Sequence, residues 1–80
     1  EPSVLDTAAQ ILIARKDLGK AEEYLSRASN SEAVTDEVYL NYVDLLIKRG
    51  KKELAGRKLQ QRQYKDNAAQ ARAEQLSGKL

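Results

Sequence analysis

Few side chains in this sequence have the chemistry that catalysis requires. Cys and His are both absent, which removes thiol nucleophiles, disulfides, the commonest zinc ligands and the usual general base at neutral pH. Glu22 and Glu23 are adjacent carboxylates, but neighbours on a helix point about 100° apart and cannot flank one bond. A Ser–Lys pair stays open, although nothing singles one out. We therefore expect a protein that is not an enzyme and binds no cofactor or metal.

A basic segment is the second place where the residue types suggest chemistry. The net charge is only +2, yet residues 1–40 hold 4 basic and 8 acidic side chains, whereas residues 41–80 hold 10 and 4. Such a segment is suited to nucleic-acid or lipid phosphates, with Tyr64 as the one aromatic free to stack on a base. We favour the alternative that it is a solvated outer face. Its cations are Lys48, Arg49, Lys51, Lys52, Arg57, Lys58, Arg62 and Lys65.

The length and hydropathy of the chain bound its class. Eighty residues are enough for one small domain. The longest apolar run, Ile11 to Ala14, is far short of the ~20 residues that a membrane-spanning helix needs. No secretory signal is visible, and the chain opens on Glu1 rather than Met. We expect a soluble protein, either processed or a fragment of a longer one, in the cytoplasm or exported; the sequence does not identify the compartment.

The elements that must position these side chains are predicted to be helices. Ala, Leu, Glu, Lys, Arg and Gln dominate, and the only proline is Pro2. We expect helices near 4–16, 18–29, 36–49, 51–63 and 67–78. Residues suited to begin or end them are Ser3 with Asp6 as a capping box, Asp17, Thr35 and Asp66 as N-caps, and Gly50 as the turn after the third helix.

An internal repeat organises these helices. A shift of the sequence along itself that places Val4 on Val38 brings further identical residues together: Leu12 with Leu46, Ile13 with Ile47, Arg15 with Arg49, Ala21 with Ala55 and Leu25 with Leu59. A second shift of the same size places Ala73 and Leu76 under Tyr39 and Tyr42. The chain thus contains two helix–turn–helix units, and the first helix of a third.

The pattern resembles the tetratricopeptide repeat. One copy is Leu5-x2-Ala8-Ala9-x2-Leu12 followed by Ala21-x3-Leu25 and Ala28, and the next is Tyr39-x2-Tyr42-Val43-x2-Leu46 followed by Gly50 and Ala55-x3-Leu59. The resemblance implies an all-α domain over residues 1–80, a right-handed α-solenoid of antiparallel helix pairs with five helices. Its units would be 2–34 and 36–68, with a capping helix at 67–80. The usual terminal Pro is missing, and Arg62 stands where the first copy has Ala28, so the second pair departs from the pattern.

The resemblance also implies a binding surface. Repeats of this kind bind a partner in the concave groove formed by the first helix of each unit. We expect a scaffold that holds an extended or helical protein segment with aliphatic and basic residues. The alternatives are head-to-tail self-assembly and anion binding by the basic segment. Helical spacing assigns to the groove Asp6, Gln10, Ile13, Leu40, Asp44, Ile47 and Glu74, with Ile13 and Ile47 equally suited to the core.

Overall fold

Five α-helices make up the chain, and no strand is present. The computed structural model describes residues 1–80 and places the helices at α1 (Pro2–Ala14), α2 (Leu18–Ser29), α3 (Asp36–Lys48), α4 (Lys52–Gln60) and α5 (Asn67–Ser77). The all-α prediction is therefore confirmed. The molecule measures 29 × 27 × 18 Å along its principal axes. None of the helices has the length and apolar composition needed to cross a bilayer.

Two of the predicted N-caps are confirmed. The Thr35 hydroxyl accepts a hydrogen bond from the Val38 backbone N–H at 3.3 Å, and the Asp66 carboxylate accepts one from Ala69 at 2.7 Å. Asp17 occupies the N-cap position of α2 but makes no capping bond through its side chain. The predicted capping box at Ser3 is wrong, because α1 begins earlier, at Pro2. The fixed φ of proline suits the first helical turn.

The ends of α1 and α3 share one hydrogen-bond pattern. At the end of α1, the backbone N–H of Asp17 donates to the Leu12 carbonyl at 2.9 Å, and that of Lys16 donates to the Ile13 carbonyl at 2.9 Å. This pair of bonds is a Schellman motif, which requires a left-handed residue after the helix. The bonds at the equivalent positions of the second unit, after α3, are Lys51 to Leu46 at 2.8 Å and Gly50 to Ile47 at 2.9 Å.

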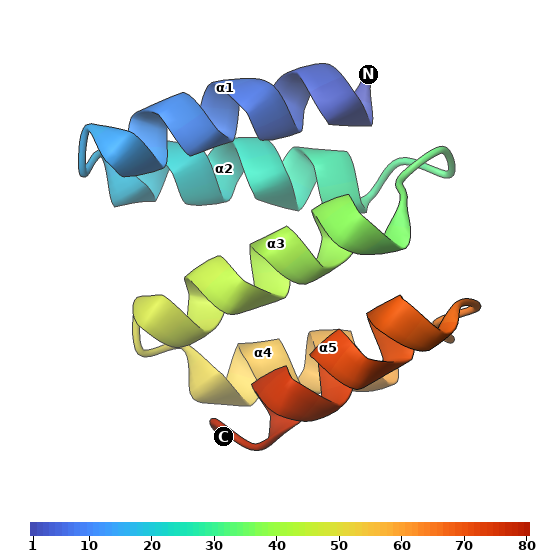
Figure 1. Ribbon diagram of the computed structural model, residues 1–80. Helices are drawn as coiled ribbons and strands as arrows, with labels where there is room; N and C mark the ends of the chain where they lie inside the picture. The colour runs from blue at the N-terminus through green and yellow to red at the C-terminus, as the bar shows by residue number, and fades with distance from the viewer.

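The central helix α3 organises the core. Figure 1 shows α1 and α2 on one side of α3, with α4 and α5 on the other, and α3 contacts all four of them. Neither α1 nor α2 contacts α4 or α5. Seven of the thirteen α3 residues are buried, because the helix is covered from both sides. Leu40, Val43 and Leu46 are fully buried there, and Ala21, Leu25 and Ala55 are fully buried in the flanking helices.

Helix α4 ends three residues before the predicted position 63. Two tyrosine hydroxyls meet the carbonyls at its end: Tyr39 donates to the Lys58 carbonyl at 2.6 Å, and Tyr64 donates to the Leu59 carbonyl at 3.1 Å. The carbonyls at a helix end lack donors from a following turn, and Tyr64 supplies one to Leu59. The Lys58 carbonyl also accepts from the Gln61 backbone N–H at 3.3 Å. Helix α4 has nine residues, whereas α2 has twelve. The start of α5 therefore follows the start of α3 by three residues fewer than the start of α3 follows the start of α1.

Candidate functional site

A chain of polar side chains crosses three helices on one side of the molecule. The Asn41 side-chain amide of α3 donates to the Asp6 carboxylate of α1 at 3.1 Å, and Gln10 donates to the same oxygen at 3.1 Å. The side-chain oxygen Oδ1 of Asn41 in turn accepts a hydrogen bond from the Arg72 guanidinium of α5 at 2.8 Å. We call this side the inner face and define it by Asp6, Gln10, Glu37, Asn41, Asp44, Lys48 and Arg72.

Two hollows open along the inner face. The smaller has a volume of about 60 Å³ and lies between α1 and α3. Its lining residues are Gln10, Ile13, Asn41, Asp44, Leu45 and Lys48. The larger has a volume of about 220 Å³ and lies where the first turns of α3 and α5 meet. Its lining residues are Asp36, Glu37, Leu40, Asp66, Ala68, Ala69 and Arg72.

The charges of the inner face are only partly neutralised within the chain. Asp44 pairs with Lys48 at 3.0 Å, one turn further along α3. The half-buried guanidinium of Arg72 has no carboxylate partner and donates to the Asn41 side chain and, at 3.4 Å, to the Glu37 backbone carbonyl. The Glu37 side chain is exposed and forms no ion pair. The face therefore presents one oriented cation and at least one free carboxylate to solvent.

Three of the residues assigned to a groove from the sequence lie on this face. Asp6 and Gln10 belong to the polar chain, and Asp44 lines the smaller hollow. Ile13 and Ile47 are partly buried and pack against the core, although Ile13 also borders the smaller hollow.

The other two assigned residues do not present exposed side chains on this face. Leu40 is fully buried and belongs to the core, although it also lines the larger hollow. Glu74 is exposed but lies two residues after Arg72, and residues two apart on a helix point about 200° apart. Since Arg72 points towards α3, Glu74 points away from it. The assignment failed because it assumed a constant repeat length, whereas the step to α5 is three positions shorter.

Sequence reasoning missed the two residues that join the helices. Asn41 was detectable, because it is an amide in a helix that is otherwise apolar at most positions. Arg72 carried no such signal, since its place opposite Asn41 depends on where α4 ends. Counted from the first residue of each helix, Thr7, Asn41 and Arg72 are equivalent positions of α1, α3 and α5.

Half of the cations in the basic segment are committed to ion pairs. Glu22 of α2 accepts from both Arg49 at 2.9 Å and Lys51 at 2.7 Å, while Lys48 pairs with Asp44. Arg62 pairs with Asp36 at 2.7 Å. The cations of the segment without a carboxylate partner are Lys52, Arg57, Lys58 and Lys65.

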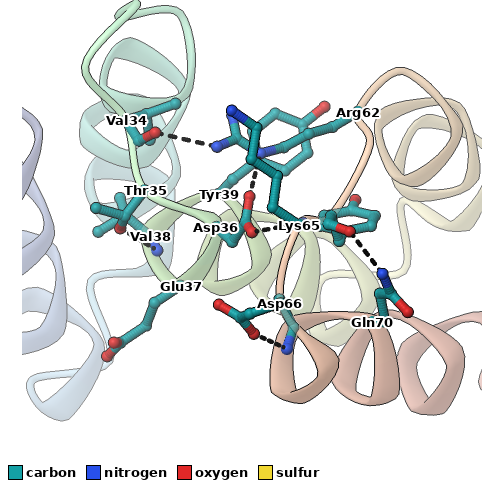
Figure 2. A network of polar contacts seen from close by, with 12 residues as sticks. Val34, Thr35, Asp36, Glu37, Val38, Tyr39, Arg62, Lys65, Asp66 and Gln70 are labelled. Atoms are coloured by element: carbon teal, nitrogen blue, oxygen red, sulfur yellow. Dashed lines mark hydrogen bonds and ion pairs between the residues drawn. The ribbon is translucent and has the colours of Figure 1, made fainter.

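Arg62 is part of a network that fastens the end of α4 to the start of α3. Figure 2 shows its guanidinium between the Asp36 carboxylate and the Val34 backbone carbonyl, to which it donates at 3.1 Å. The guanidinium carbon lies 5.1 Å from the centre of the Tyr39 ring. The hydrogen bond from Arg62 holds the pKa of Asp36 below its ordinary value, against the opposing effect of burial. This arrangement explains why an arginine replaces the alanine of the first unit.

Tyr64 belongs to the same region. It packs against the core, and its ring centre lies 6.4 Å from that of Tyr39. Burial raises the pKa of the Tyr64 hydroxyl to about 12. The Tyr64 ring is thus partly buried and its hydroxyl is bonded within the chain, which leaves less of the ring open to a nucleic-acid base than the sequence suggested.

No protein-family model, curated protein or solved structure matches this chain.

Proposed function

We propose that this chain is a protein-interaction module that acts by binding and not by catalysis. It holds a partner segment across the inner face of α1, α3 and α5. The observation that carries the proposal is the polar chain from Asp6 through Asn41 to Arg72, which joins three helices and leaves hydrogen-bonding groups directed at open hollows. Polar groups that are fixed in place lose little freedom when a partner binds, so they contribute to affinity and specificity.

We propose further that the fold is a tetratricopeptide-like, right-handed α-solenoid of two and a half units. Support comes from the matching Schellman motifs at the ends of α1 and α3. Each of the four residues bonded in the first motif is the same number of positions ahead of its counterpart in the second. Further support comes from the order of contacts, in which α1 and α2 lie apart from α4 and α5. Short helix pairs that contact only their neighbours are typical of repeat proteins.

The inner face favours a particular partner chemistry. A basic side chain would pair with Glu37, which has no cation of its own, and a carboxylate would pair with Arg72. An aliphatic side chain would fill the larger hollow, whose apolar lining residues are Leu40, Ala68 and Ala69. Both hollows are shallow, so we expect weak binding, with dissociation constants on the order of micromolar.

A peptide selection tests the proposal. A library of random short peptides displayed on phage would be selected on the wild-type chain and then tested against Arg72→Gln. The matched control is Arg57→Gln, which removes an exposed, unpaired arginine on α4. We expect binders whose affinity falls about tenfold on Arg72→Gln, equivalent to ~1.4 kcal/mol, and is unchanged on Arg57→Gln. Circular dichroism would establish that both variants stay folded. Peptides that bind both variants equally well would contradict the proposal.

A further inference from the structure

A stripe of apolar side chains on α1 has no partner in the molecule. Val4 is 65% exposed and Ile11 is 50% exposed, although most other large apolar residues are buried or packed against the core. With Ser3, Thr7 and Ala8 they line an open hollow of about 370 Å³. Val4, Ala8, Ile11 and Arg15 follow one another at helical spacing. We call these four residues the α1 stripe; it shares no residue with the inner face.

The chain contains a covered version of the same stripe. The residues at the equivalent positions of the second unit are Val38, Tyr42 and Leu45 of α3 and Arg49, which directly follows α3. The first three are 7%, 4% and 2% exposed. Arg49 reaches Glu22 of α2 at 2.9 Å, so this side of α3 lies against α2. The three apolar positions are thus buried in α3, which lies against α2, whereas Val4 and Ile11 at the equivalent positions of α1 are exposed.

We propose that the α1 stripe is a docking site for an amphipathic helix of the α2 type, supplied in the same polypeptide ahead of Glu1. Such a helix carries a carboxylate that pairs with Arg15, as Glu22 pairs with Arg49. On the face that meets α1 it also carries aliphatic side chains, which cover Val4 and Ile11. The connection it needs is the one that joins α2 to α3, residues 30–35.

A second copy of the chain fits the stripe less well. A stable interface between separate proteins usually takes about 20–30 residues a side. The α1 stripe offers two large apolar side chains and one cation, which is a small part of such an area. A helix joined to the same chain needs far less contact area, because it is already held near its site. The small apolar area of the α1 stripe therefore favours a helix in the same polypeptide over a dimer.

The chain itself supplies the probe for a test. A copy of residues 17–34 joined directly before Glu1 would stand in the same relation to α1 as α2 does to α3. We expect the urea midpoint to rise by on the order of 1 M relative to the 80-residue chain. The backbone amides of Val4, Ala8 and Ile11 should gain protection from hydrogen exchange. A joined copy that leaves both the midpoint and the protection unchanged would overturn the proposal.

Two variants separate docking from general stabilisation. Ile11→Lys should abolish the rise in the joined chain while leaving the original chain unchanged, because Ile11 is exposed there. In the joined chain, Arg15→Glu should reduce the rise of the urea midpoint. Replacing the glutamate copied from Glu22 by arginine in the same chain should restore it. Sedimentation of the original chain tests the competing occupant. A dimer that Ile11→Lys dissociates would identify a second copy and overturn the proposal.

Discussion

Lys16 and Gly50 occupy the same position of two equivalent helix ends, and both have a left-handed backbone, with φ of 63° and 78°. Only glycine adopts this conformation without a steric cost from its side chain, which for other residues is roughly 1–2 kcal/mol. The first unit therefore carries backbone strain that the second unit avoids.

This pair leads to the first prediction. Lys16→Gly should raise the free energy of unfolding by about 1 kcal/mol, and Gly50→Ala should lower it by a similar amount. The space around Gly50 is open, so the loss would come from φ alone. Gly78→Ala is the matched control, because Gly78 has a φ of −64°. Urea unfolding would measure all three; equal effects of Gly50→Ala and Gly78→Ala would contradict this account.

The second prediction concerns acid. The pKa of Asp36 is lowered in the folded state by the hydrogen bond from Arg62, so the unfolded chain binds the proton more readily. The pair therefore stabilises the fold above about pH 4, the ordinary pKa of Asp, and this contribution is lost as the pH falls through the lowered value. Asp36→Asn should cost ~1–2 kcal/mol at pH 7. Urea unfolding from pH 7 to pH 2 should show the two proteins converging in acid, whereas a constant difference would contradict the prediction.

The third prediction concerns alkali. Burial raises the pKa of Tyr64 to about 12, so the folded chain retains its proton at a pH where the unfolded chain has lost it. The stabilisation is complete below about pH 10 and is lost as the pH rises towards 12. Tyr64→Phe also removes the hydrogen bond to the Leu59 carbonyl, which should cost ~1 kcal/mol at pH 7. Its stability relative to the wild type should improve between pH 10 and 12, as followed by urea unfolding; a difference that does not change with pH would exclude this titration.

The fourth prediction concerns the contact between paired helices. Ala21 and Ala55 are fully buried at equivalent positions of α2 and α4. Ala21→Arg or Ala55→Arg would place an unpaired charge in the core, at a cost of at least about 3 kcal/mol. Circular dichroism should show a large loss of helicity and a lower melting temperature. The exposed neighbour Glu23→Arg should change little. An unchanged melting curve for Ala21→Arg would mean that the helices pair differently.

The local features of the fold were predictable from the sequence. The starts of α3 and α5 and the whole course of α2 agree with the expected ranges. Thr35, Asp66 and Gly50 perform the capping and turn roles that their residue types favour, because these roles depend on backbone atoms only a few residues away. The equivalent helix ends follow from the internal repeat in the same way.

The composition of the inner face was decided by tertiary structure. Helix α4 is three residues shorter than α2, and Arg72, rather than Glu74, is directed at Asn41. The Tyr39 and Tyr64 hydroxyls donate to carbonyls at the end of α4. A helix turns about 100° per residue, so a small change of register sends a different side chain to each neighbour. The sequence by itself determined that five helices form and where α2, α3 and α5 begin, because those interactions are local. Which side chains meet across the helices was decided by packing between residues far apart in the chain.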